Sequence, residues 1–310
     1  MTRRGLVQSG ARPLRDPETN EYIPLAWETV PCPVCASERF RPYETFGHRN
    51  QYRYVRCLDC GLFYASPRPR YDQDFIDCCY SDYEQFVDNA TVEDLRAIRT
   101  SSLTMFEKEV QHLLQFDRQR TALLDIGSAM GTFLLAARPH YDRLTGLDVS
   151  EKMAAFVRSD IGVDVRIEQF HEHWPEQPYS LIHMSHVIEH IPNPNEWLAH
   201  ARRILAPGGI LVVNVPNKLG YSNVLKHVLW KLKLKKHLAK IWRDPARTPD
   251  HLYEPTLGSF RYLFETNGYR VLDQYSYSRR DPVSNQGPGA RLLYRRLKLG
   301  SNLGFVLSPE

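Results

Sequence analysis

The stretch LLDIGSAMGTFLLAA, residues 123–137, runs from an apolar, strand-like segment through Asp125, Gly127 and Gly131 into an apolar segment typical of a helix. In a parallel sheet covered by helices, the first strand-to-helix turn at the carboxyl edge is the usual ligand site. Glycines at such a turn let a ligand approach the backbone closely. The stretch therefore predicts a ligand-binding turn at the start of an α/β domain.

Strand-like and helix-like segments alternate after this turn. The strand-like segments are RLTGLDV (143–149), VDVRIE (163–168), YSLIHMS (179–185) and ILVVNV (210–215), and the helical ones are SEKMAAFVRSD (150–160) and NEWLAHARRILA (195–206). Apolar strands separated by helices indicate a parallel sheet with helices on both faces. Before the turn, residues 91–116 have apolar side chains at helical spacing. We expect LGFVLS, residues 303–308, to form a final edge strand.

The spacing of the glycines argues against one class of ligand, the dinucleotides. A dinucleotide fingerprint starting at Gly127 needs glycines at positions 129 and 132, where this chain has Ala129 and Thr132. An acid stands two residues before the first glycine, and a second acid, Asp148, ends the next strand-like segment. A carboxylate at that place can accept hydrogen bonds from both hydroxyls of a ribose.

Five segments in this order resemble the class I S-adenosylmethionine-dependent methyltransferases. They are LLDIGSAMGTF, LTGLDVS, YSLIHMSHVIEHIPNP, ILAPGGILVVNVPN and HLYEPTLGSFRYLFETNGYRV. The small-molecule enzymes of the group, such as ubiquinone-biosynthesis O-methyltransferases, are the most similar. The resemblance implies a Rossmann-like, seven-stranded sheet and a methyltransferase (EC 2.1.1.-) that uses S-adenosylmethionine.

The resemblance also assigns roles to single positions. Asp125 and the turn Gly127, Ser128, Ala129 and Gly131 would lie near the methionine part of the cofactor, Asp148 would hold the ribose, Val149 would flank the adenine, and Gln169 or Phe170 would cover its other side. Ala129 departs from the family, which usually has glycine at this position.

The segment SHVIEHIPNP, residues 185–194, follows the fourth strand and contains the letters H-x-x-E-H of an inverted zinc peptidase. That motif needs a long helix, and Pro192 with Pro194 prevents one here. If the chain is a methyltransferase, this segment faces the substrate that accepts the methyl group. The sequence offers His186, then His190 and then His251 as the general base, because a neutral imidazole accepts a proton near neutral pH.

Some relatives bind a divalent ion through E-x-x-E-H at this place. This chain has His186 where the first carboxylate would be, which leaves Glu189 as the single carboxylate. One carboxylate is a poor magnesium site, because magnesium prefers oxygen ligands. We therefore favour acid–base chemistry over a catalytic metal, with the pair Glu189 and His190 supporting the loop.

Two Cys-x2-Cys pairs, Cys32 with Cys35 and Cys57 with Cys60, are separated by 21 residues. This spacing is typical of a structural Zn²⁺ site closed by four thiolates, which leaves no open coordination position. Gly61 fits a turn that needs a positive φ. We expect a small zinc ribbon whose metal supplies much of its folding energy.

These patterns divide the chain of 310 residues into four parts. They are a disordered leader (1–27), the zinc ribbon (28–66), a bridging segment with a helix (67–118) and the methyltransferase domain (119–310) with a basic helical insertion (218–250). We find no signal peptide and no apolar run of the roughly 18 residues that cross a membrane, and expect a cytoplasmic protein.

The formal net charge of +4 is too small by itself to indicate nucleic acid. Within the insertion, the basic segment 225–243 contains Trp230 and suits an anionic membrane surface or an anionic substrate, or alternatively a partner or homodimer interface. The leading prediction is methyl transfer to a small molecule such as a sugar, glycan end, quinone-like lipid or secondary metabolite. The alternatives are an RNA methyltransferase that uses the ribbon and the lysine-rich helix, and a non-catalytic cofactor-binding scaffold.

Overall fold

The computed structural model describes residues 25–46, 52–231, 251–278 and 292–310. The chain forms two compact units, one of Met1–Ala90 with Lys226–Glu254 and one of Thr91–Leu225 with Pro255–Glu310. The predicted leader up to residue 24 and residues 232–250 of the basic insertion lie outside the described residues. In the part of the chain that the structure describes, no helix has the length and apolar character of a membrane span.

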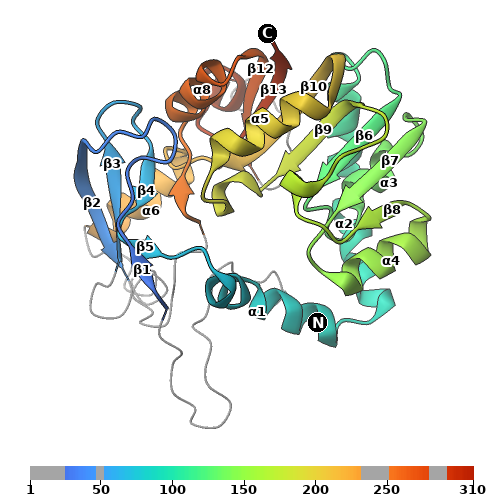
Figure 1. Cartoon of the computed structure of the whole chain (residues 1–310), viewed down its shortest axis with the longest axis horizontal. Helices are drawn as coiled ribbons and strands as arrows, with labels where there is room; N and C mark the ends of the chain where they lie inside the picture. Colours follow the sequence, from blue (N-terminus) through green and yellow to red (C-terminus); the bar gives the residue numbers. More distant parts are fainter. Residues whose placement is uncertain (1–24, 47–51, 232–250, 279–291) are drawn as a thin grey trace. The chain divides into compact units, whose positions relative to one another are not determined.

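The second unit is built on a seven-stranded sheet in the order β12-β13-β10-β9-β6-β7-β8 (Figure 1). Its strands are β6 (Ala122–Ile126), β7 (Arg143–Leu147), β8 (Asp164–Arg166), β9 (Tyr179–Ser185), β10 (Leu205–Pro216), β12 (Tyr269–Tyr277) and β13 (Asn302–Pro309). Every residue of β6 is buried, as expected for a central strand covered on both faces. The predicted α/β class with a seven-stranded sheet is confirmed.

The five strands predicted to be parallel are parallel, and the sheet becomes mixed at β12 and β13. β8, β7, β6, β9 and β10 are parallel, whereas β13 pairs antiparallel with both β10 and β12. The expected edge strand LGFVLS is therefore wrong in position, because β13 lies between two strands. Six consecutive residues from Asn302 to Leu307 are buried, so this strand has no solvent-facing side.

The strand order reverses between β6 and β9. The chain moves outward through β6, α3 (Thr132–Ala137), β7, α4 (Glu151–Ile161) and β8, and then returns to β9, α5 (Pro194–Ile204) and β10. Because such crossovers are right-handed, opposite directions place α3 and α4 on one face and α5 on the other. The reversal creates a switch point at the carboxyl ends of β6 and β9, where open α/β sheets bind ligands.

The helix α2 (Val92–Leu113) confirms the helix expected before the glycine turn. It begins with a capping box in which the Thr91 side chain and Asp94 exchange hydrogen bonds with each other's backbone. It packs against α3, and Arg96 and Arg99 form ion pairs with Asp160 at the end of α4. These contacts fix α2 against the ligand-binding half of the sheet.

The first unit contains a four-stranded sheet in the order β11-β4-β3-β2 and a two-stranded sheet, β1-β5. The strands are β1 (Trp27–Glu28), β2 (Phe40–Phe46), β3 (Tyr52–Cys57), β4 (Phe63–Ala65), β5 (Arg68–Pro69) and β11 (Tyr253–Glu254), followed in sequence after β5 by α1 (Gln73–Asn89). Among the residues that the structure describes, the remaining helices are α6 (Tyr221–Lys231) and α8 (Leu257–Thr266), with short helical turns η2 (Phe170–Glu172), η3 (Ile188–His190) and η4 (Leu292–Arg296).

Gly131 joins the ligand-binding turn to α3 and has a left-handed backbone with φ +70°. A Cβ atom there would lie 2.9 Å from a methyl carbon of Val157 in α4. Gly162, at the carboxyl end of α4, has φ +68° but has open space around its Cα. The two glycines therefore share a backbone conformation and differ in the space available.

We expect Gly131→Ala to destabilise the protein by about 2–4 kcal/mol, because left-handed strain and overlap with Val157 add. The matched change Gly162→Ala should cost only about 1–2 kcal/mol, from the backbone term alone. Denaturant unfolding of both variants measures the difference. Equal losses would show that α3 and α4 are not packed around Gly131 as described.

Candidate functional site

The turn after β6 contains three residues in the left-handed region: Gly127 (φ +71°), Ala129 (φ +44°) and Gly131 (φ +70°). A non-glycine residue in this region costs roughly 1–2 kcal/mol, so Ala129 adopts this conformation at a cost that glycine would avoid. The N–H groups of Gly127 and Ser128 both donate to the Leu147 carbonyl, at 2.8 and 3.0 Å. The turn is thereby fixed to the carboxyl end of β7.

Asp148 connects the ends of two strands through its carboxylate. One oxygen accepts from the Ala129 N–H at 2.7 Å and the other accepts from the Ser150 N–H at 2.9 Å. The side chain is nearly buried, and burial raises the pKa of Asp148 despite these hydrogen bonds. Each carboxylate oxygen has a further lone pair, so two ribose hydroxyls remain acceptable partners.

Asp125 is buried and its carboxylate oxygen Oδ1 lies 2.7 Å from Nδ1 of His183. His183 stands in the middle of β9, and its ring stacks on Phe133 of α3 with centroids 3.7 Å apart. Its second ring nitrogen, Nε2, lies 3.6 Å from the Glu109 carboxylate of α2. His183 was not among the residues predicted for the site, because a lone histidine in an apolar strand gives no signal of its partners.

The pKa values of His183 and Asp125 in this cluster differ from their ordinary values. Burial lowers the pKa of His183, but the hydrogen bonds and charges of Asp125 and Glu109 outweigh burial and raise it from 6.5 to about 9. Burial raises the pKa of Asp125, and the hydrogen bond from His183 opposes that shift. A charged imidazolium beside Asp125 favours the ionised form of this carboxyl group and opposes the effect of burial.

Residues assigned to the adenine lie around the ends of β7 and β8. Val149 is 50% exposed and Gln169 is exposed, so both can meet a ligand. Phe170 is 2% exposed, and its ring packs against Trp197 and His200 of α5 with centroids 5.0 and 4.9 Å apart. Phe170 therefore supports this loop from the core.

His186 follows β9 directly and has φ +57°, a left-handed conformation that is rare for histidine. Its N–H donates to the Asn214 carbonyl at 2.9 Å, which holds this backbone. The side chain is 43% exposed and its Nδ1 lies 3.4 Å from the carboxylate of Glu189, which is fully buried. A buried carboxylate beside Nδ1 stabilises a proton there and leaves Nε2 to accept one.

The segment after β9 lies against the glycine turn. A Cβ atom at Gly127 would come within 2.7 Å of a Val187 methyl carbon. His190 is half-buried at the end of η3. His251 belongs to the first unit, where its carbonyl accepts the hydroxyl of Tyr54.

The second unit thus brings most predicted site residues together at one sheet edge. These are Asp125, Gly127, Ser128, Ala129, Gly131, Asp148, Val149, Gln169, His186, Glu189 and His190. The edge is the carboxyl end of β6, β7, β8 and β9, at the switch point. It offers hydrogen-bond acceptors for a cofactor and an exposed imidazole for proton transfer.

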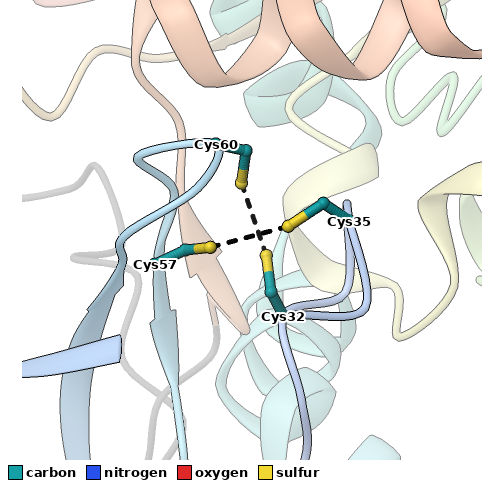
Figure 2. Close-up of side chains that lie close together, drawn as sticks. All are labelled: Cys32, Cys35, Cys57 and Cys60. Carbon is teal, nitrogen blue, oxygen red and sulfur yellow. Dashed lines mark hydrogen bonds between the residues drawn. The ribbon is translucent and has the colours of Figure 1, made fainter. Parts of the chain in front are cut away.

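The four predicted cysteines of the first unit converge on one point (Figure 2). The sulfur atoms of Cys32 and Cys60 are 3.5 Å apart, as are those of Cys35 and Cys57, and all four lie within 4.8 Å of one another. These separations are too long for disulfides, whose S–S bond is about 2.05 Å. Four sulfurs about 2.3 Å from one Zn²⁺ would lie about 3.8 Å apart, so the donor set fits that ion.

Each cysteine pair forms a tight turn of the same kind. Ala36 and Gly61, the residues after Cys35 and Cys60, have φ +56° and +76°. The Asp59 N–H donates to the Cys57 sulfur at 3.4 Å. The neighbouring Cys60 thiol lowers the pKa of Cys32 to about 6, whereas burial raises the pKa of Cys35 to about 11 and the contact with Cys32 raises the pKa of Cys60.

Comparison with known proteins gives a match to the model of a methyltransferase domain over residues 98–274. A trans-aconitate 2-methyltransferase of Escherichia coli O1:K1 / APEC is 33% identical over 111 residues, which are 35% of this chain and 44% of the relative. A ubiquinone biosynthesis O-methyltransferase of Paramagnetospirillum magneticum is 28% identical over 95 residues, or 29% and 38% of the two chains. The chain spans less than half the length of these curated relatives.

Among solved structures, a Thermotoga maritima protein described as a SAM-dependent methyltransferase, possible histamine N-methyltransferase, aligns with a TM-score of 0.49 and 18% identity. The alignment covers 74% of this chain and 99% of that one.

The His183 cluster predicts a stability that depends on pH. Its pKa is raised on folding, so its contribution is fully present below pH 6.5 and is lost as pH rises through about 9. Relative to His183→Asn, the wild-type protein should lose on the order of 3 kcal/mol of unfolding free energy over that window. Urea titrations from pH 6 to 10 measure this; a constant difference between the two proteins would contradict the charged cluster.

Proposed function

The chain belongs to the methyltransferase-domain family, and from that premise we propose that it transfers a methyl group from S-adenosylmethionine to a small-molecule acceptor. The observation that carries the proposal is the pairing of the glycine turn with Asp148 at the ends of β6 and β7. A hydrogen bond from Ala129 to that carboxylate places a close-approach turn beside a ribose acceptor. This arrangement suits a nucleoside with a polar amino-acid tail.

Each side chain at this edge would hold a different part of the cofactor. Asp148 would accept the ribose hydroxyls through its remaining lone pairs. Val149 would lie against the adenine, together with Ile167, which is similarly exposed after β8. Asp125 would face the amino group of the methionine part, for which a carboxylate is the natural partner.

His186 would act as the general base. S-adenosylmethionine, when bound, supplies a methyl group already activated on a sulfonium, so the protein has to align the acceptor and remove its proton. The Glu189 carboxylate lies near Nδ1 of His186 and would keep the proton on that nitrogen. Nε2 would then accept the proton of the acceptor hydroxyl or amine as the new bond to carbon forms.

A small-molecule acceptor fits the site better than RNA. One matched relative is named for trans-aconitate, a small molecule. β9 leads into Ser185 and His186, not into the Asn/Asp-Pro-Pro-aromatic motif that base-amino methyltransferases use. The lysine-rich segment on which RNA or membrane binding would depend falls mainly in residues 232–250, outside the described residues.

We expect labelled methyl groups from S-adenosylmethionine to enter the small-molecule-plus-lipid fraction of a cell extract, with His186→Gln lowering the rate about 10²–10⁴-fold. The variant should bind S-adenosylhomocysteine normally, because His186 removes a proton and does not hold the cofactor. Label in RNA would overturn the acceptor class. Cofactor binding without transfer to any fraction would indicate the non-catalytic scaffold.

We further propose that the four cysteines hold a structural Zn²⁺. Four thiolate donors leave no coordination position for a substrate, so the ion would contribute to folding and not to the reaction. Three of the ligands are buried, at the ends of turns that anchor β2 and β3. The ion would hold the two cysteine turns together at this end of the first unit.

The purified protein should contain one zinc ion per chain, and Cys57→Ser should abolish it, because three thiolates bind zinc far more weakly than four. Elemental analysis with limited proteolysis tests this: the variant should become cleavable around β2 and β3. Cys79→Ser, which changes a half-buried cysteine outside the cluster, is the matched control and should keep the metal. A zinc-free, protease-resistant wild-type protein would contradict the proposal.

A further inference from the structure

His183 places both of its ring nitrogens against polar groups in the interior of the second unit. Nδ1 lies 2.7 Å from Asp125 Oδ1, and because a carboxylate only accepts, this nitrogen carries a proton. Nε2 lies 3.3 Å from the side-chain nitrogen of Asn214 in β10 and 3.6 Å from the Glu109 carboxylate of α2. The ring is thus fixed from both ends and by the stacked Phe133.

The polar contacts form a chain across the sheet. Asn214 donates to Glu109 at 2.6 Å, so its amide is itself held by α2. Tyr275 of β12 donates to the Asn214 oxygen at 3.5 Å. Each of these side chains is buried. The Glu109 carboxylate accepts from Asn214 and lies beside the protonated Nε2 of His183, so it holds both groups in one arrangement.

This network of polar contacts ends at Asp125, which lies next to the proposed cofactor turn. Only one oxygen of Asp125 has a hydrogen-bond partner among the residues that the structure describes, and that partner is His183. Asp125 stands two residues before Gly127, at the carboxyl end of β6. The orientation of His183 therefore decides where the second carboxylate oxygen points.

We propose that His183 is a positioning residue that donates from Nδ1 to Asp125 and aims its second oxygen at the amino group of the bound cofactor. The proposal rests on the proposed function, which supplies the ligand. His183 does not touch the ligand. It acts through Asp125, and Asn214 and Glu109 hold its ring in place.

Two substitutions separate this role from packing. His183→Phe keeps a ring against Phe133 but removes the donor, whereas His183→Asn removes the ring but keeps an N–H near the position of Nδ1. Positioning predicts that the Phe variant binds S-adenosylhomocysteine about 10- to 100-fold more weakly, and the Asn variant within about fivefold of wild type. A purely structural role predicts the reverse order.

A second ligand makes the readout specific. 5′-Methylthioadenosine lacks the amino-acid part of the cofactor, so its affinity should be the same in both variants and in wild type. Isothermal titration calorimetry on the full chain measures both ligands. His112→Asn is the matched control, because His112 forms a similar pair with Asp273 at 2.8 Å and leaves Asp125 untouched.

The outcomes are distinct. Wild type that binds neither ligand overturns the proposed function, and the inference with it. Wild type that binds S-adenosylhomocysteine while the Phe variant binds it equally well overturns the positioning role alone. If circular dichroism shows that the Phe variant is unfolded, His183→Asn is compared with His183→Ala. Both variants lack the ring, but only Asn keeps a donor. The proposal is supported if the Ala variant loses affinity and the Asn variant does not, and it is overturned if the two bind equally.

Discussion

Two carboxylates buried at the ends of adjacent parallel strands impose the constraint on which the ligand-binding edge depends. An ionised carboxylate in an apolar setting requires hydrogen-bond donors. Asp148 obtains them from the backbone, through Ala129 and Ser150, and this pairing fixes the turn after β6. Asp125 obtains one from a side chain, His183, and that imidazole in turn needs partners. Asn214 and Glu109 supply these partners, so burying Asp125 requires a network of polar side chains around it.

Backbone strain lies where the ligand-facing groups are placed. Ala129 and His186 are both non-glycine residues with positive φ, and each is held by a hydrogen bond from its own N–H, to Asp148 and to the Asn214 carbonyl respectively. Strained residues persist only when their surroundings over-determine them. Asn214 contacts both histidines: its backbone carbonyl accepts from the His186 N–H, and its side chain lies against the His183 ring. One residue of β10 thus links the proposed base His186 to His183, the partner of Asp125.

Much of this edge could be predicted from sequence, because its signals are local. The apolar run into Asp125, the glycines and the Ser150 cap identify strand, turn and helix without knowledge of neighbours. The cysteine pairs identify their cluster for the same reason, since four sulfurs at that spacing have few other uses. The interior position of β13 and the partners of His183 were not predictable, because both depend on pairings between segments that lie far apart in the sequence.

Asp148 takes its hydrogen bonds from backbone N–H groups and Asp125 takes one from a side chain, so the two sites tolerate substitutions differently. Donors from the backbone are present whatever the side chains are, so the Asp148 pairing survives any substitution that keeps the turn in its conformation. A donor from a side chain depends on the residue at position 183 and on those that hold it, which come from β9, β10 and α2. The turn after β6 is thereby coupled to residues of β9, β10 and α2. Arg96 and Arg99 bind α2 to α4. Changes in the packing of α2 would reach Asp125 through Glu109 and His183.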